Sequence, residues 1–380
     1  MLSLLLAIPA GAQQPPYKDA RRHKRGYFGP GREEPEPRNL NAVLIGYFGP
    51  DDPRHPQGGS AWLGAGMALE EANQQGDYKG MPFRFVQAWD DKPWAGGVSA
   101  VTRMAYLDRV WAIIGSTDGA STHLAEQVVA KARLALVDPV STDESVNQAN
   151  LAWMFSCVPG DRAIAAAIGA ALIGSFALLS ATDHDSRVLA AELKSVLASK
   201  KTVPSEHTEF PAGLERAGDL ARQVAASGAG SVVILAGPTE SARLVTEVRR
   251  VDSRIRIYGG PSMGRQSFLD SAKGSAEGVL FPLLVEERQG ALAFSEKFRA
   301  RYEHEPDYAA CHAYDATRIV IAAVHKAGLN RVRIMDAIEA SSPWQGVSGN
   351  IRWDPLGRNS RAVGLGTIQD GRVRRALPGR

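Results

Sequence analysis

Two loops in the first half of the chain carry hydroxyl side chains directly after apolar segments. The first loop, STDGAST at residues 116–122, follows VWAIIG, and the second, PVSTDE at residues 139–144, follows RLALVD. In a parallel sheet both loops would open at the carboxyl ends of their strands, where doubly wound folds bind small molecules. Hydroxyls, backbone N–H groups and helix N-termini suit an anionic group such as a carboxylate. We therefore predict a binding site for a small ligand, without evident catalytic chemistry.

The second loop has an alternative structural interpretation. Ser141 and Glu144 have the spacing of a capping box, in which the serine side chain and the glutamate side chain satisfy the first amides of a helix. The same loop can cap a helix and contact a ligand, so we keep both interpretations.

A serine hydrolase is a competing hypothesis. Gly260–Gly264 reads GPSMG and matches G-x-S-x-G after a strand pattern, which is the context of a nucleophile elbow around Ser262. Asp307 or Asp315, and then His325, would follow in the order of a triad. However, His325 lies within an apolar helical pattern, and no HGGG-like oxyanion segment occurs.

Metal and cofactor chemistry is not expected. Asp183-His184-Asp185 contains usual metal ligands, but three consecutive residues do not readily converge on one ion, so an exposed polar loop is the preferred interpretation. No Walker loop or G-x-G-x-x-G follows a strand, so no nucleotide is predicted. Cys157 and Cys311 could form a disulfide or remain two buried thiols, and the sequence leaves both open.

Apolar β-rich segments alternate with amphipathic helical segments from Asn41 onward. The strand candidates are residues 42–47, 83–88, 110–114, 134–137, 176–180, 231–236, 255–258 and 278–284. The helix candidates between them are residues 60–75, 95–109, 123–132, 185–200, 213–227 and 240–251. Strands that are apolar throughout and are each followed by a helix predict parallel sheets covered on both faces. Later helices at 291–302, 308–327 and 331–340 suggest that the chain returns to complete the first α/β unit.

Length and charge indicate a globular protein of about two domains. The chain has 380 residues, with 44 Lys and Arg against 41 Asp and Glu and a net charge of +3. Because a domain usually has roughly 100 to 200 residues, a chain of this length suggests about two domains. Charges of both signs are mixed along the chain, so no nucleic-acid partner is expected. No segment approaches the ~20 apolar residues of a membrane span.

The first residues predict export. An apolar stretch from Leu2 to Ile8 precedes the A-x-A pattern at residues 10–12, so we expect a signal peptide at 1–12 that is cut after Ala12. Residues 13–40 are rich in Pro, Gly and charge and are expected to form a flexible leader. No cysteine lies near the cleavage point to carry a lipid. The mature protein is therefore predicted to be soluble and periplasmic.

Several motifs occur in an order that points to one family. They are IGYFGP, GAGMALEEANQQGDYKG, AIIGSTDGASTHLA, LVDPVSTDES, WMFSCVPGD, YDATRIVIAAVHKAG and WQGVSGNIRWDPLGR. Over residues 43–367 the chain resembles the type I periplasmic binding proteins, specifically the branched-chain amino-acid (Leu/Ile/Val) and amide-binding family of ABC importers. The resemblance implies an α/β fold with two Rossmann-like lobes, whose parallel sheets are joined by three chain crossings near residues 155–158, 281–284 and 344–349.

The same resemblance implies the domain division and the function. The N-terminal lobe would comprise residues 41–156 plus 284–345, and the C-terminal lobe residues 157–283 plus 346–380. The lobes would close over a small polar or carboxylate-bearing ligand, such as an amino acid, an amide or an organic acid, and present it to a membrane permease. The protein would be a monomer without enzymatic activity or cofactor. A periplasmic ligand sensor of the same fold is the alternative.

The resemblance also implies the site. The first lobe would hold the ligand's carboxylate through the loops that match Gly119-Ala120-Ser121 and Ser141-Thr142. Pocket positions of the second lobe match Asp185, Pro238 and Ser262. Trp62 and Asp118 are further candidates by position.

One departure from the family pattern leaves the ligand open. Amino-acid binders of this family carry an acid after a Gly-Pro pair to meet the ammonium, but here Ser262 follows Gly260-Pro261. An ammonium in a closed cleft without a counter-charge would cost several kcal/mol. Either Asp118, Asp183 or Asp185 replaces the missing acid, or the ligand lacks an ammonium.

Overall fold

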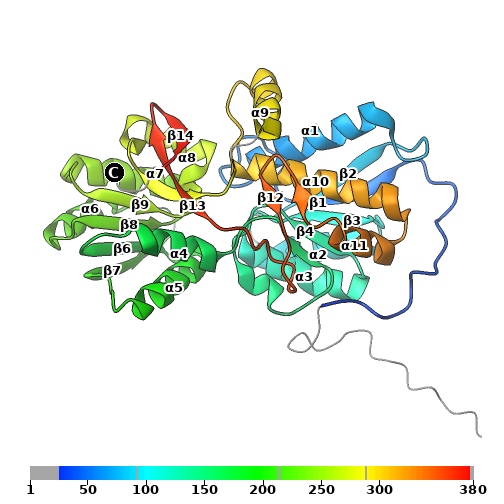
Figure 1. Cartoon of the computed structure of the whole chain (residues 1–380), viewed down its shortest axis with the longest axis horizontal. Helices are drawn as coiled ribbons and strands as arrows, with labels where there is room; N and C mark the ends of the chain where they lie inside the picture. Colours follow the sequence, from blue (N-terminus) through cyan, green and yellow to red (C-terminus); the bar gives the residue numbers. More distant parts are fainter. Residues whose placement is uncertain (1–24, 91–92, 212, 214, 287–288, 377–380) are drawn as a thin grey trace, which may run out of the picture.

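The computed structural model describes residues 25–90, 93–211, 213, 215–286 and 289–376, and it divides into two lobes along its long axis (Figure 1). The strands are β1 (Val43–Phe48), β2 (Phe83–Ala88), β3 (Ala112–Gly115), β4 (Ala135–Asp138), β5 (Met154–Ser156), β6 (Phe176–Ala181), β7 (Glu206–Phe210), β8 (Ser231–Leu235), β9 (Arg256–Gly259), β10 (Leu280–Leu283), β11 (Trp344–Gln345), β12 (Asn350–Ile351), β13 (Gly364–Gln369) and β14 (Arg372–Arg375). The α-helices are α1 (Gly59–Gly76), α2 (Pro93–Tyr106), α3 (Gly119–Ala132), α4 (Asp161–Ala171), α5 (His184–Ser199), α6 (Ala217–Ala226), α7 (Pro238–Val251), α8 (Gln266–Ala272), α9 (Gln289–Tyr302), α10 (Tyr308–Ala327) and α11 (Arg331–Glu339). Short 3₁₀ helices are η1 (Glu144–Asn147), η2 (Pro261–Gly264) and η3 (Lys273–Ala276).

The sheet of the first lobe is parallel. Within the described part of the chain its order is β2-β1-β3-β4-β5. The strands β3 and β4 are buried along their whole length, because helices cover both faces: α2 and α3 lie on one side and α1, α10 and α11 on the other (Figure 1). Apolar strands buried on both faces explain the uninterrupted runs AIIG and ALV in the sequence.

The sheet of the second lobe repeats this arrangement. Its order over the described residues is β14-β13-β10-β9-β8-β6-β7, with β6 to β10 parallel and β13 and β14 added in antiparallel fashion. In each lobe the chain winds outward from a central strand in two directions, so a crevice opens at the carboxyl ends of two neighbouring strands. These crevices lie between β1 and β3 and between β6 and β8. The predicted two-lobed α/β fold is confirmed.

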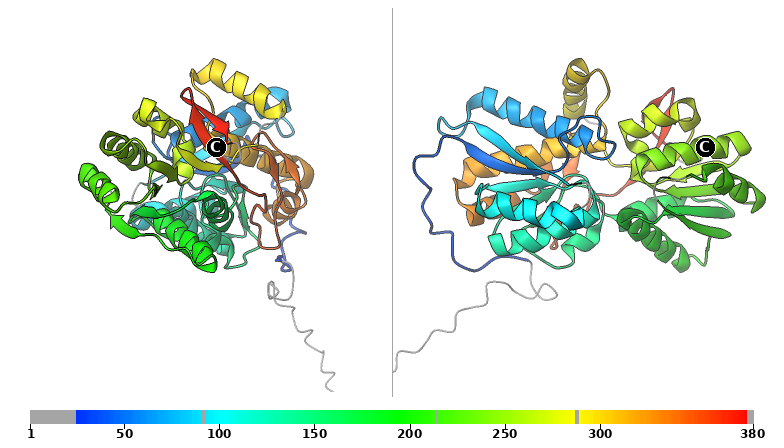
Figure 2. Two further views of the ribbon diagram at one scale, coloured as in Figure 1. Left: turned by 60° about the vertical axis from the view of Figure 1, so that its left-hand side comes forward. Right: turned by 180° about the vertical axis from the view of Figure 1, so that it is seen from behind.

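The late helices return to the first lobe, as the element order predicts. α10 packs along α1, and the two views in Figure 2 keep them side by side. The approach is close at Gly64 of α1, where an added Cβ would lie 2.1 Å from the carbonyl oxygen of Ala310. Only a residue without a side chain fits at this contact.

Two of the three chain crossings lie where the resemblance places them. The chain leaves the first sheet after β5, which ends at Ser156, and leaves the second sheet after β10, which ends at Leu283. The positions expected were residues 155–158 and 281–284.

The third crossing was predicted at Trp344–Gly349, and that position is wrong. These residues form a small hairpin of β11 and β12 that stays with the first lobe. The hairpin is held by Asp315 of α10, whose carboxylate accepts hydrogen bonds from the amides of Val347 at 2.9 Å and Ser348 at 2.8 Å. The chain reaches the second sheet only at β13. Residues 346–351 therefore pack with the N-terminal lobe, contrary to the predicted division.

The expectation of a flexible leader is also wrong for residues 25–36, which make specific contacts with the first lobe. Arg25 and Tyr27 are both 3% exposed, and the Tyr27 ring lies 5.1 Å from the ring of Trp153. Arg32 forms an ion pair with Asp336 at 2.7 Å. The segment runs along the outside of the first lobe in Figure 2, because its aromatic and arginine side chains find partners there. The predicted signal peptide at 1–12 and the start of the leader lie outside the described residues.

Two further features concern the cysteines and membrane-spanning helices. Cys157 and Cys311 are both buried and unbridged, so the free-thiol alternative holds. In the part of the chain that the structure describes, no helix is both long and apolar enough to cross a bilayer.

Candidate functional site

A cavity of about 270 Å³ lies between the lobes, at the carboxyl ends of both sheets. Loops after β3 and β4 line it from the first lobe, and loops after β6, β8 and β9 line it from the second. Its lining residues are Gln57, Thr117, Asp118, Ala120, Val140, Thr142, Asp183, His184, Asp185, Ser186, Leu189, Leu235, Ala236, Gly237, Pro238, Gly260, Pro261, Ser262, Arg265 and Tyr308. This is the crevice position expected of doubly wound sheets, and the volume suits a small molecule.

Aspartates start the helices on both sides of the cavity. Asp118 caps α3 by accepting from the Ser121 amide at 2.8 Å, and Asp183 caps α5 by accepting from the Ser186 amide at 2.9 Å. A short acceptor before the first turn satisfies an otherwise unpaired helical amide. Both carboxylates are thus held by their own helices.

Asp185 bridges the lobes. Its Oδ1 accepts a hydrogen bond of 2.8 Å from the amide of Gly119, at the start of α3. Burial raises the pKa of Asp185 well above its usual value, and the nearby charge of Asp118 adds to this effect. Burial likewise raises the pKa of Asp118. The cavity therefore holds two carboxyl groups whose ionisation is disfavoured by burial.

The carboxylate cradle predicted for the first lobe, Gly119-Ala120-Ser121 and Ser141-Thr142, is only partly exposed to the cavity. Ala120 and Thr142 line it, whereas Ser121 and Ser141 are buried at 0% and 3% exposure. The amide of Ser141 donates to Asp138 at 3.0 Å, and the amide of Gly119 is taken by Asp185. A ligand carboxylate would therefore compete with protein carboxylates for these amides.

The capping box predicted for the second loop does not form. The 3₁₀ helix η1 begins at Glu144, and its cap is Asp143, whose Oδ1 accepts from the Ser145 amide at 2.9 Å. Ser141 instead accepts a hydrogen bond of 3.3 Å from the Asp143 amide, within a local turn. Glu144 is thus the first residue of η1 and not the third residue after its cap, so the capping-box arrangement is absent.

The other candidates divide between the cavity and the core. Pro238, at the first position of α7, and Ser262 both line the cavity. Trp62 packs against the rings of Tyr47 and Phe85, at 4.9 Å and 5.7 Å, and does not line the cavity. An aromatic side chain near the site thus belongs to the core of the first lobe.

The geometry does not assemble a hydrolase triad. The Ser262 hydroxyl lies 3.3 Å from that of Ser241, not against a histidine. His325 packs in the first lobe beside the rings of Tyr78 and Phe83. Asp307 caps α10 by accepting from the amides of Ala309 and Ala310.

Arg265 is the functional candidate that sequence reasoning missed. Its side chain is 3% exposed, donates through Nη2 to the carbonyl oxygen of Gln57 and lies 4.8 Å from the centre of the Tyr308 ring. Its Nη1 lies 3.9 Å from Asp307 and has no hydrogen-bond partner among the described residues. A buried guanidinium group facing a cavity can bind a carboxylate through two parallel hydrogen bonds.

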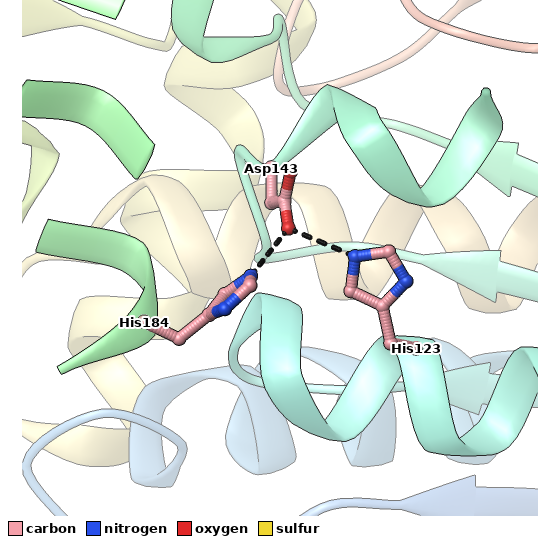
Figure 3. Close-up of side chains that lie close together, drawn as sticks. All are labelled: His123, Asp143 and His184. Atoms are coloured by element: carbon pink, nitrogen blue, oxygen red, sulfur yellow. Dashed lines mark hydrogen bonds and ion pairs between the residues drawn. The ribbon is translucent and has the colours of Figure 1, made fainter. Parts of the chain in front are cut away.

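A second cluster lies at the edge of the cavity (Figure 3). The Oδ2 atom of Asp143 is 3.2 Å from Nε2 of His123 and 2.7 Å from Nε2 of His184. Burial opposes ionisation of Asp143, but hydrogen bonds from His123, Ser145 and His184 outweigh it and lower the pKa of the carboxyl well below its usual value. The hydrogen bond to Asp143 raises the pKa of His123 to about 9. His184 comes from the second lobe, so this cluster also spans the interface.

Comparison with known proteins agrees with this geometry. A family model described as "Periplasmic binding protein" matches residues 43–372. A search of curated protein sequences gave no match.

Solved structures share the fold. The substrate-binding protein LivJ from Streptococcus pneumoniae, in complex with isoleucine, is 20% identical with a TM-score of 0.79, over 87% of this chain and 97% of LivJ. The leucine-binding protein LivK from Thermotoga maritima is 18% identical with a TM-score of 0.80, over 88% of this chain and 98% of LivK. A solute-binding protein from R. palustris, in complex with benzoate, is 13% identical with a TM-score of 0.77, over 88% of this chain and 95% of that one.

Proposed function

Because this chain belongs to the periplasmic binding protein family, we propose that it captures a small polar or carboxylate-bearing molecule between its lobes and delivers it to the permease of an ABC importer. The family assignment agrees with the resemblance predicted from the motifs, and the family binds ligands rather than catalysing reactions. The finer statement, which concerns the ligand and its delivery, rests on the cavity.

The observation that carries the proposal is the buried guanidinium of Arg265 in the interlobe cavity. Arg265 is 3% exposed, and its Nη1 has no hydrogen-bond partner within the described ranges. Arg265 is paired in charge with Asp307 at 3.9 Å, but a buried N–H group without a hydrogen bond still costs free energy, which a ligand carboxylate would recover. Thr142 and Ser262 supply hydroxyl groups on opposite sides of the same cavity.

The carboxyl groups of the cavity suggest what the other end of the ligand carries. Asp185 lies between the lobes and interacts with an amide, not with a cationic side chain. Asp185 would therefore accept a hydrogen bond from an ammonium or amide N–H group of the ligand. In this role it would replace the acid that is missing after Gly260-Pro261. A ligand with an anionic end and a donor end, such as an amino acid or amide, fits better than a simple organic acid.

Similar folds bind both kinds of molecule. LivJ is in complex with isoleucine, and the R. palustris protein is in complex with benzoate. The fold alone thus leaves the ligand class open, and the choice made here depends on Arg265 and Asp185.

A thermal-shift panel of amino acids, amides, short carboxylates and aromatic acids tests the proposal, since a ligand of the native state raises the melting temperature. We expect amino acids or amides to produce the largest shifts. Thr142→Ala should reduce the shift, whereas Thr202→Ala, far from the cavity, should not. The proposal fails if no compound raises the melting temperature. The cradle assignment fails if Thr142→Ala responds like the wild type.

A further inference from the structure

We propose that His123, Asp143 and His184 form a binding site for a divalent transition-metal ion such as Zn²⁺, which holds the two lobes together. Three ligand-type atoms, two imidazole nitrogens and one carboxylate oxygen, all lie within 4.8 Å of one another (Figure 3). Two histidines and a carboxylate are a common ligand set for zinc, with a fourth position left for water or a further ligand. This site differs from the sequence expectation of no metal, because its residues come from separate elements.

The two separations from Asp143 to the histidines are near those of a tetrahedral site, and the two imidazole nitrogens lie within 4.8 Å of each other. Metal–ligand bonds of about 2.0–2.2 Å place neighbouring ligand atoms roughly 3.3 Å apart. The observed separation of Asp143 Oδ2 from His123 Nε2 is 3.2 Å, and that from His184 Nε2 is 2.7 Å. A shift of about half an ångström in the His184 side chain would therefore open room for the ion. The side chain of His184 is 40% exposed, so it has space to move.

Outer-shell contacts support the same conclusion. The Nδ1 atom of His123 faces Oε2 of the buried Glu126 at 3.6 Å, which leaves Nε2 as the nitrogen that points to Asp143. Histidines that bind metals usually direct their other nitrogen at a carboxylate in this way. Asp143 is oriented in turn by the Ser145 amide, which donates to Oδ1 at 2.9 Å.

Charge is the second independent observation. Glu126 is 5% exposed, and its Oε1 has no hydrogen-bond partner among the described residues. His123 lies between two carboxylates, Glu126 and the fully buried Asp143, whose two charges together match one divalent cation. The Oε1 atom of Glu126 thus marks buried negative charge beside the cluster, which a bound cation would help to balance.

The location gives the site a consequence for lobe closure. His123 and Asp143 belong to the first lobe, whereas His184 opens α5 of the second lobe and also lines the ligand cavity. An ion bound by all three residues favours the closed arrangement, since the open arrangement would lose one ligand. This inference does not depend on the identity of the solute, because metal binding is measured without it.

Calorimetric titration of tag-free, chelator-treated protein with ZnCl₂ tests the proposal. We expect one Zn²⁺ per chain, and we expect His123→Gln, Asp143→Asn and His184→Gln each to weaken binding by about 100-fold or more. His207→Gln, a histidine of the second lobe outside the cluster, should bind as the wild type does. Since the side chain of His184 is 40% exposed, His184→Gln should keep the fold of the wild type, which its circular-dichroism spectrum checks. The proposal is overturned if the wild type shows no stoichiometric zinc binding, or if His184→Gln binds zinc with wild-type affinity.

Visible absorption of the Co²⁺-loaded protein gives a second readout. Tetrahedral coordination by nitrogen and oxygen should produce intense d–d bands in the wild type and in His207→Gln, and these bands should be lost in His184→Gln. Weak octahedral bands in all three proteins would contradict the site.

Discussion

The amide of Gly119 in the first lobe donates a hydrogen bond of 2.8 Å to the carboxylate of Asp185 in the second. This contact closes the cavity at the start of α3, where an added Cβ on residue 119 would lie 2.7 Å from that same carboxylate oxygen. Glycine at this position therefore permits the close approach of the two lobes.

Gly119→Ala should weaken solute binding. The added methyl group obstructs the closed arrangement at a cost of about 1–3 kcal/mol, which corresponds to an affinity loss of roughly 5- to 140-fold. Calorimetric titration with a solute from the thermal-shift panel measures this loss. Gly274→Ala, where a Cβ meets nothing within 4 Å, is the control and should bind normally. Equal affinities for the two variants would show that this contact does not form in the bound state.

Tyr27→Ala should destabilise the first lobe. Tyr27 is 3% exposed against Trp153, and its hydroxyl donates to the carbonyl oxygen of Pro30 at 3.0 Å. Loss of a buried aromatic ring costs about 3–5 kcal/mol. Phe28→Ala, at a neighbouring side chain that is 49% exposed, should cost far less. Urea denaturation compares the two, and a matching loss in both would mean that residues 25–36 are not docked in solution.

Gly64→Ala and Gly66→Ala should have opposite effects on stability. A Cβ at residue 64 would lie 2.1 Å from the Ala310 carbonyl oxygen, whereas one at residue 66 meets nothing within 4 Å. The first change should destabilise by about 1–3 kcal/mol or more through overpacking of α1 against α10. The second should stabilise by about 0.5–1 kcal/mol, because alanine is the better helix former. Chemical denaturation gives both values, and a neutral Gly64→Ala would argue against this helix packing.

Asp315 should make stability depend on pH. Burial raises its pKa to about 6, although the amides of Val347 and Ser348 donate to its carboxylate. A folded-state pKa above the unfolded value favours folding fully below about pH 4, and this contribution is lost as the pH rises through 6. The stability advantage of the wild type over Asp315→Asn should thus shrink by on the order of 3 kcal/mol between roughly pH 4 and pH 7. Parallel stability profiles for the two proteins would contradict this pKa.

The sequence predicted the buried parts of the fold well, because long apolar segments have few alternatives. The strands at residues 83–88 and 176–181 were placed to within a residue. β7 was missed, since its sequence EHTEF is polar and only partly buried at the edge of its sheet. β5 was missed because it has only three residues.

The site was predictable where it depends on loops that follow strands, and not where it depends on distant contacts. Thr142, Asp185 and Ser262 follow predicted strands, so topology brings them together. Arg265 gains its importance from contacts with Gln57 and Tyr308, which nothing in its local sequence indicates. The cluster of His123, Asp143 and His184 likewise has no spacing motif.

Calorimetric titration of one solute into the wild type, Thr142→Ala and Arg265→Lys tests most directly whether the ligand lies between the lobes. Thr142 belongs to the first lobe and Arg265 to the second, and both line the cavity. We predict saturable binding to the wild type and an affinity loss of about tenfold or more in each variant, since each loses a hydrogen bond to the ligand. Wild-type affinity in both variants would place the ligand elsewhere and contradict the account.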